Sequence, residues 1–303
     1  MENNYDIIIV GGGPIGASTA YFLSQKTDKK ILLLERGNKD DHVRTFEYAG
    51  GSIRWWWETE EKIKMTKATA DFIKQKNSEG VDLSYHKDSY VFLNRGIQIP
   101  SINISGKKLA DYFLKSSEDK GVEYKEEELK AIKKESNSYM ITTDKGEYVG
   151  KKVLLALGTK TKDFVPALPI ETEKRVLFVL DREVKGEMVS FPHVVMPFQK
   201  GIVFLFVKKF GSEYKIVVGQ EDVIEHNDRW EEEDYFGKLM ELGLGDHVPF
   251  LKDAKVEKIL WGFDMKHKTP LIYTEDEMLY AVTCGSAIRS CAYIGEQIAK
   301  KLD

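Results

Sequence analysis

The chain has 303 residues, 42% of them hydrophobic and 31% charged, a composition typical of a folded globular protein of about two domains. Its formal net charge of -4 argues against a general nucleic-acid binder, which needs a basic face to meet phosphate. No apolar stretch of about 18 residues is present, and the first apolar run, from Ile7, follows acidic Glu2 and Asp6. We therefore expect a cytoplasmic protein with neither a transmembrane segment nor a signal peptide.

The first part of the chain has the pattern of a βαβ unit. Asp6–Val10 and Lys30–Glu35 are short aliphatic runs typical of buried parallel strands, and residues 17–24 between them have helical periodicity. A glycine-rich turn joins the first strand to this helix. The arrangement predicts the start of a doubly wound sheet.

That turn has the spacing G-x-G-x-x-G, formed by Gly11, Gly13 and Gly16. In such a motif the first glycine permits the tight turn, the second lets the backbone approach a pyrophosphate, and the third allows close helix–strand packing. Glu35 ends the second strand about 20 positions further on, where a carboxylate accepts hydrogen bonds from ribose hydroxyls. The motif predicts a dinucleotide site but does not distinguish NAD(P) from FAD.

The remaining elements alternate between α/β and β-rich patterns. In chain order we expect a helix over residues 55–76, a strand over 89–93, a helix over 109–117, strands over 139–143, 152–158, 175–180, 194–197, 202–207 and 214–219, a helix over 228–242, a strand over 279–283 and a helix over 290–301. The fold class is therefore α/β. We expect a Rossmann-type nucleotide-binding domain with a central parallel sheet in residues 1–85, 104–171 and 259–303. A smaller substrate domain on a mixed or antiparallel sheet takes residues 86–103 and 172–258.

Four stretches resemble a known family of flavoproteins. They are Asp6–Arg36, Gly50–Arg54, Lys152–Thr159 and Trp261–Lys301. The last contains Gly262, a Thr269-Pro270 pair and a glycine turn at Gly285 before the final helix. In these stretches the chain is similar to the FAD-dependent oxidoreductases that include D-amino acid oxidase, glycine oxidase and monomeric sarcosine oxidase. The resemblance implies FAD as the cofactor, because ordinary NAD dehydrogenases place no second glycine turn and helix at the C-terminus.

The same resemblance implies which residues bind the cofactor. They are Gly11, Gly13, Pro14, Ile15, Gly16, Glu35, Arg36, Gly50, Gly51, Ser52, Leu129, Ala156, Gly158, Gly262, Gly285, Ser286, Ala287 and Ile288. Some relatives attach the flavin through a cysteine shortly before their Thr-Pro pair. Residues 262–269 contain no cysteine, and no histidine stands beside Gly50 and Gly51, so we expect FAD to be bound noncovalently.

Three basic residues are candidates for catalysis. Arg54 and Arg289 fall where sarcosine oxidase-like members hold the substrate carboxylate, and a guanidinium binds a carboxylate through two parallel hydrogen bonds. Two surface arginines with unrelated salt bridges are the alternative. Lys215 lies in the region where sarcosine oxidases carry a lysine that promotes the reaction of reduced flavin with oxygen. The alternative for Lys215 is a strand residue that faces solvent.

The resemblance implies an oxidoreductase that oxidises the C–N bond of a small amino acid or N-substituted amino acid by hydride transfer to flavin N5. The expected partners are a small carboxylate-bearing substrate and an electron acceptor, either oxygen or an electron carrier, with no nucleic acid. A 2-hydroxy acid dehydrogenase remains an alternative, because the same arginine pair would serve it. A flavoprotein subunit without independent turnover is another.

Other residue types carry weaker predictions. The two cysteines, Cys284 and Cys291, are expected to be reduced packing residues, and the six histidines show no metal-binding spacing. At least one residue of Trp55-Trp56-Trp57 is expected to pack in the core, with lining of the active site as an alternative. His42 is expected to be a solvated loop residue.

Overall fold

The structure is a computed structural model that describes residues 3–37, 44–55, 59–186, 189, 191–221, 232–266, 269–276 and 278–303. The chain divides into two compact units. The first comprises residues 1–83, 104–173 and 263–303, and the second comprises residues 84–103 and 174–262. The FAD-binding and substrate-binding roles expected of the two predicted domains stay predictions.

The first unit is built on a sheet with a parallel centre, as the sequence predicts. Its strand order is β15-β16-β9-β1-β2-β6, and all neighbours are parallel except the edge pair β15–β16. A meander of β7 and β8 continues antiparallel from the first half of β9. The bounds are β1 (Asn4–Val10), β2 (Ile31–Glu35), β6 (Glu123–Glu126), β7 (Leu129–Lys134), β8 (Tyr139–Thr143), β9 (Glu147–Leu155), β15 (Leu271–Glu275) and β16 (Leu279–Thr283).

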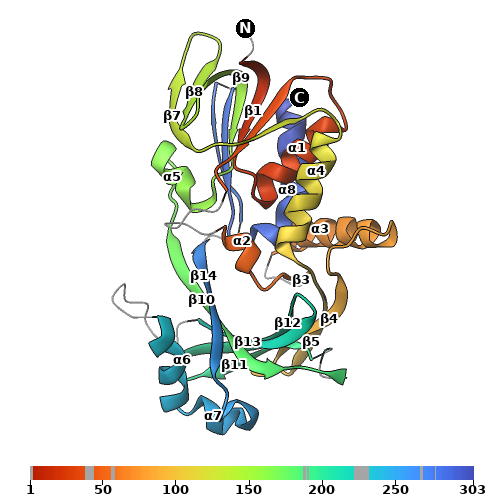
Figure 1. The fold of residues 1–303 in the computed structure, drawn as a ribbon, viewed down its shortest axis with the longest axis vertical. Coiled ribbons are helices and arrows are strands. Elements are labelled where there is room, and N and C mark those ends of the chain that lie inside the picture. Colours follow the sequence, from red (N-terminus) through yellow and green to blue (C-terminus); the bar gives the residue numbers. More distant parts are fainter. Residues whose placement is uncertain are drawn as a thin grey trace. The chain divides into compact units, whose positions relative to one another are not determined.

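Both faces of this sheet are buried, which explains the unbroken aliphatic runs of its central strands. Successive side chains of a strand point to opposite faces. Ile7 and Ile9 pack with helix residues, whereas Ile8 and Val10 pack with residues of the meander. Figure 1 shows α1, α4 and α8 side by side along one face of the sheet. The helices of this unit are α1 (Pro14–Ser24), α2 (Thr45–Tyr48), α3 (Glu60–Ser78), α4 (Gly106–Glu118), α5 (Thr161–Phe164) and α8 (Ala287–Leu302), with a short 3₁₀ turn, η1 (Gly158–Lys160).

Four helix starts differ from the sequence-based prediction, and two of them, those of α1 and α4, lie three residues earlier than expected. The helix expected from Trp55 begins at Glu60, because the side chain of Thr59 accepts a hydrogen bond from the Lys62 backbone N–H and so caps the N-terminus. The last helix begins at Ala287, three residues before the predicted start. Arg289 therefore lies in the first turn of α8 and not in the turn that precedes it.

The second unit is a mixed sheet with two helices on one face. Its strand order is β14-β10-β13-β12-β11-β4-β5, antiparallel at every pairing for which the register is known except β11–β4. The bounds are β4 (His86–Phe92), β5 (Ile97–Asn103), β10 (Thr172–Glu183), β11 (His193–Phe198), β12 (Gly201–Phe210), β13 (Glu213–Glu221), β14 (Val256–Met265), α6 (Glu232–Glu241), α7 (Leu244–His247) and η3 (Pro249–Leu251). Phe178 of β10 and Phe236 of α6 are in ring contact inside the core that joins sheet and helices. The helix predicted over 228–242 is confirmed from Glu232, and residues 228–231 lie outside the described residues.

Six strands, β3 (Ser52–Arg54), β5, β6, β7, β14 and β15, are absent from the sequence-based prediction. β6 and β7, with the sequences EYKE and LKAIKK, carry too many charges for an aliphatic pattern, because most of their side chains face solvent. In the parts of the chain that the structure describes, no helix has the length and apolarity needed to cross a membrane.

The contact between α1 and α8 leaves no room for a side chain at Gly295. The Ser18 hydroxyl donates a hydrogen bond of 2.8 Å to the Cys291 carbonyl. A Cβ at Gly295 would lie 2.3 Å from Ser18 Oγ and 2.8 Å from the Ser18 backbone carbonyl carbon. Since a backbone atom is involved, the two helices would have to move apart.

We predict that Gly295→Ala lowers the free energy of unfolding by about 1–3 kcal/mol through overpacking. Gly237 of α6 is a matched control, because a Cβ there meets nothing within 4 Å. Gly237→Ala should raise stability by about 0.5–1 kcal/mol through helix propensity. Urea denaturation followed by circular dichroism measures both changes, and equal stability of the two variants would contradict the α1–α8 packing described here.

Candidate functional site

The glycine turn lies between β1 and α1 and is shaped by close backbone contacts. Gly11 has φ +107°, and a Cβ there would lie 2.4 Å from the Ala156 carbonyl oxygen. A Cβ at Gly16 would lie 1.8 Å from the Gly11 carbonyl oxygen. Both positions therefore require glycine. The second glycine of the motif, Gly13, is different, because its Cβ position meets only the Phe46 ring, at an ordinary contact distance of 3.7 Å.

The open side of Gly13 adjoins the N-terminus of α1. Gly13 is the N-cap of this helix, no side chain caps it, and Pro14 and Ile15 form its first turn. The first N–H groups of a helix have no partner within the helix, and they favour an anion. An uncapped helix start behind a bare backbone turn fits the pyrophosphate of a dinucleotide.

Glu35 is held at the end of β2 by the same turn. Its carboxylate is buried and accepts hydrogen bonds from the Gly12 N–H at 2.5 Å and the Gly37 N–H at 3.1 Å. An ionised carboxylate has about four acceptor positions, so two remain for other donors. This arrangement fits the two hydroxyls of an adenosine ribose. Arg36 makes an ion pair of 3.6 Å with Glu128.

A second group of predicted residues meets at β3 (Ser52–Arg54), which follows the Gly50-Gly51 turn. Gly51 has φ +73°. The Nε of Arg289 donates a hydrogen bond of 2.8 Å to the Ser52 carbonyl oxygen. Since residues two apart on a strand share a face, Ser52 and Arg54 point to the same side. The structure thus brings Arg289 to the short strand that ends in Arg54, although 237 positions separate Ser52 from Arg289.

Ser52 adds a polar atom to this region. Its hydroxyl oxygen is buried and has no hydrogen-bond partner among the described residues. A buried hydroxyl without a partner costs free energy, so such a group in a folded protein calls for an explanation. An unseen ligand that hydrogen-bonds to Ser52 Oγ would supply one.

The start of α8 is a strained turn. Gly285 is buried, and Ser286 has φ +61° and ψ +36°, a left-handed conformation that serine rarely adopts. Such residues concentrate at binding and catalytic sites. Ala287 and Ile288 follow, and the Ile288 side chain lies 2.6 Å from the position of a Cβ on Gly106 of α4. The sequence-based prediction names these residues but does not predict the left-handed serine.

The other predicted cofactor residues are dispersed. Ala156 packs against Gly11, and the Gly158 carbonyl accepts a hydrogen bond of 3.0 Å from the Thr283 hydroxyl. Leu129 begins β7 and is buried in the core cluster that contains Leu32 and Leu34. Gly262 lies in β14 of the second unit. A cofactor role for each of these four residues stays a prediction.

Lys215 of β13 lies in the second unit between two carboxylates. It pairs with Glu257 at 2.9 Å and with Glu213 at 3.1 Å, and hydrogen bonds to these two groups raise its pKa. Directly opposite it in the β12–β13 register is Lys208, which sequence reasoning missed. Burial of the Lys208 ammonium, with repulsion from Lys258, lowers its pKa to about 8. The register is a property of the folded sheet, so no local sequence signal marks Lys208.

Among the described residues, both cysteines are buried and no cluster of metal ligands is present. Cys284 and Cys291 are both free and buried, and burial raises the pKa of the Cys291 thiol to about 12. Within the described ranges, no group of three or more His, Cys, Asp or Glu side chains could hold a metal ion. Trp55 lies 4.4 Å from Lys74 Nζ in a cation–π contact. His42, Trp56 and Trp57 lie outside the described residues.

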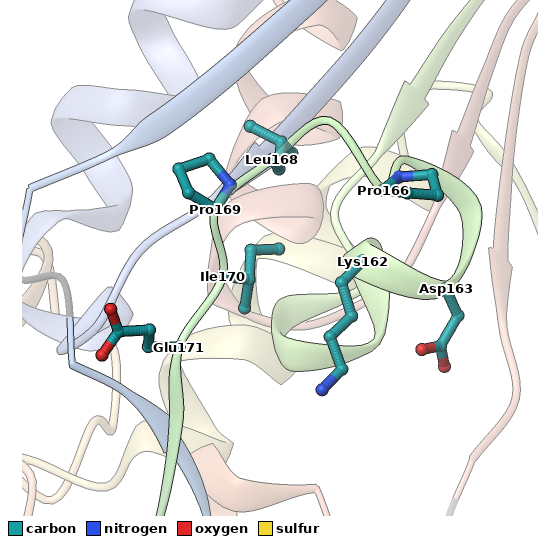
Figure 2. A pocket seen from close by; sticks show the side chains of 7 residues that line it. All are labelled: Lys162, Asp163, Pro166, Leu168, Pro169, Ile170 and Glu171. Carbon is teal, nitrogen blue, oxygen red and sulfur yellow. The ribbon is translucent and has the colours of Figure 1, made fainter.

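One hollow of about 480 Å³ lies on the first unit after α5. Figure 2 shows the side chains around it, from Lys162 and Asp163 of α5 to Pro166, Leu168, Pro169, Ile170 and Glu171 of the following segment. None of these residues is among those predicted to bind cofactor or substrate. The hollow therefore adds nothing to the candidate site.

Comparisons with known proteins place the chain among oxidoreductases. A family model described as pyridine nucleotide-disulphide oxidoreductase matches residues 8–187. "FAD-dependent oxidoreductase domain-containing protein 1" of Xenopus laevis is 32% identical over 99 residues, which are 29% of this chain and 20% of that protein. The match thus spans only a fifth of the length of this curated relative.

Solved structures share the fold over nearly the whole chain. L-proline dehydrogenase from P. horikoshii has a TM-score of 0.79 at 17% identity and covers 98% of this chain and 93% of that one. Glycine oxidase from Bacillus cereus ATCC 14579 has a TM-score of 0.75 at 18% identity and covers 98% and 97%. The expected resemblance to the amino acid oxidases is therefore confirmed in the fold. Since the family model covers more than half of the chain, this protein is an oxidoreductase that belongs to the pyridine nucleotide-disulphide oxidoreductase family.

Proposed function

We propose that this protein is an FAD-dependent oxidoreductase that oxidises the C–N bond of a small amino acid or N-substituted amino acid. The observation that carries the proposal is the hydrogen bond from Arg289 Nε to the Ser52 carbonyl, on the strand that ends in Arg54. It supports a two-arginine site for a substrate carboxylate. Proline dehydrogenase and glycine oxidase, whose fold this chain shares, act by name on amino acids.

FAD fits the residues of the first unit. The bare turn at Gly13 would hold the diphosphate, Glu35 would accept hydrogen bonds from the adenosine ribose, and Ser52 Oγ offers a buried partner for a polar atom. When bound, FAD supplies the hydride-accepting chemistry of flavin N5. We expect it to be noncovalent.

The chain's own contribution to the reaction is orientation and charge. Two guanidinium groups would bind the carboxylate through hydrogen bonds that also fix its plane, and so hold the reacting C–H bond in one direction. Lys215 is proposed only as a group that acts in the reoxidation step, because its two carboxylate partners keep it charged. The final electron acceptor is oxygen or an electron carrier, and we place the protein in the cytoplasm.

The name of the family model suggests disulphide reduction, which the cysteines disfavour. Such chemistry needs a reactive thiolate. The chain has only two cysteines, and burial keeps the Cys291 thiol protonated at neutral pH. The proposed reaction uses neither cysteine.

The first prediction concerns the cofactor. The purified protein should be yellow and should release FAD, not FMN, on acid precipitation, because the turn and Glu35 recognise the adenosine half. Chromatography of the supernatant identifies the flavin. Flavin that stays with the precipitate would overturn noncovalent binding, and a colourless protein that takes up no added FAD would overturn the cofactor itself.

The second prediction concerns Gly13. A Cβ fits there without a clash, so Gly13→Asp should fold, yet its carboxylate would stand where the diphosphate binds. We expect the FAD content to fall at least tenfold while the circular dichroism spectrum stays unchanged. Gly237→Asp adds the same charge at an exposed position of α6 and should keep its FAD. Equal FAD content in the two variants would rule out the turn as the diphosphate site.

The third prediction concerns the arginine pair. Loss of one partner from a desolvated charge pair costs about 2–5 kcal/mol, roughly 30- to 5,000-fold in binding. Arg54→Met and Arg289→Met should each lose that much affinity for an acidic substrate and keep FAD, whereas Arg95→Met, on an exposed turn of the second unit, should not. Lysine at either arginine position should recover only part of the lost affinity, because it lacks the planar guanidinium group.

The measurement for this third prediction is anaerobic bleaching of the bound flavin by a panel of amino acids, N-methyl amino acids and 2-hydroxy acids. Bleaching by the hydroxy acids alone would indicate a 2-hydroxy acid dehydrogenase, in which the arginine pair binds the carboxylate of the hydroxy acid. Methionine variants that react as fast as the wild type would remove the main support for any carboxylate substrate.

A further inference from the structure

The short helix α2 is fixed beside the glycine turn by its packing. Two ring atoms of Phe46 lie 3.7 and 3.8 Å from the position of a Cβ on Gly13. The Phe46 carbonyl oxygen lies 2.5 Å from the position of a Cβ on Gly106, the first residue of α4. Close contacts on two sides thus hold Phe46 next to the open side of the turn.

Arg44, the residue before α2, is held on this helix. Its guanidinium carbon lies 4.7 Å from the centre of the Phe46 ring, a cation–π contact. Its Nη1 lies 3.1 Å from Oε1 of Glu47, and the two side chains are only 15% and 11% exposed. A largely buried ion pair loses much hydration and is weak evidence for a stabilising role. The ion pair with Glu47 therefore does not by itself explain why an arginine lies at this position.

Tyr124 locates the same cation relative to Glu35. Tyr124 of β6 lies opposite Leu33 of β2, next to the strand end that carries Glu35. Burial raises the pKa of Tyr124, the negative charge of Glu35 raises it further, and the positive charge of Arg44 opposes the rise. Both charges thus act on one hydroxyl. Arg44 thus lies against Phe46 beside the glycine turn, and its charge also reaches Tyr124, which pairs with the strand that Glu35 ends.

We propose that Arg44 binds the diphosphate of FAD and that Glu47 positions it for this contact. The proposal rests on the proposed function and names a residue that the glycine motif does not contain. The turn and the helix start offer N–H groups but no full positive charge, and Arg36 is paired with Glu128. A guanidinium supplies that charge and two parallel hydrogen bonds to phosphate oxygens. Because Glu47 already orients the Arg44 guanidinium, the arginine side chain loses less conformational entropy when the phosphate binds.

The test measures binding of FAD, ADP and adenosine to flavin-depleted protein by flavin fluorescence and calorimetry. Arg44→Met should weaken FAD and ADP by about 10- to 100-fold, the loss of one charge-assisted contact, and leave adenosine unchanged. The salt dependence of ADP binding should become shallower in this variant. Arg95→Met should change none of these values.

Glu47→Gln and the double variant R44M/E47Q separate binding from a structural role. If Arg44 binds phosphate, Glu47→Gln keeps most of the FAD affinity, and the double variant is as weak as Arg44→Met. If Arg44 only neutralises Glu47, the double variant recovers wild-type affinity, which would overturn the proposal. So would an equal loss of adenosine binding. The double variant leaves no unpaired buried carboxylate, so it decides the question even if Arg44→Met does not fold. Wild-type protein that binds neither FAD nor ADP would instead overturn the proposed function.

Discussion

The close approach of Gly16 to the Gly11 carbonyl is the constraint on which the rest of the candidate site depends. With no side chain at either position, α1 starts directly against β1 and β9, and this fixes the direction of the helix. Ser18 of this helix donates a hydrogen bond to the Cys291 carbonyl, and this contact fixes the position of α8 along α1. α8 in turn places Arg289 on β3. Backbone contact at one turn therefore determines, through two helices, where a guanidinium lies near the other end of the sequence.

The negative and positive side chains around the glycine turn have different kinds of partner. Glu35 takes N–H donors from both sides, whereas Arg44 and Arg36 are each paired with a carboxylate. This separation of acceptors from cations is what the proposed FAD site requires, because FAD carries both ribose hydroxyls and phosphates. The Arg44–Glu47 pair keeps the cation in place before any ligand arrives.

Sequence reasoning predicted the features that local patterns encode. The βαβ unit follows from aliphatic runs, glycine spacing and Glu35, and each of these signals lies within a few residues of the element it specifies. The α3 start was wrong because the aromatic Trp55 fits a helical period, whereas the Thr59 cap decides where the helix begins. Lys208 and Arg44 were missed for a different reason. The pKa of Lys208 depends on burial and on Lys258. Arg44 acquires its position from contacts with Phe46 and Glu47, and Phe46 itself packs against Gly13 and Gly106. Such properties exist only in the folded chain.

The discontinuity of the first unit has a consequence for the order of folding. β16 and α8 complete its sheet and its helix layer, yet they follow the whole of the second unit in the chain. The hydrogen bond from Ser18 to Cys291 closes a loop of 273 residues. At ordinary rates of synthesis, about 5–20 residues per second, the early βαβ unit waits roughly 15–60 seconds on the ribosome for its partners. During that time the aliphatic face of β1 and α1 lacks its cover. Nascent chains of this protein should therefore depend on chaperones more than the stability of the finished fold suggests.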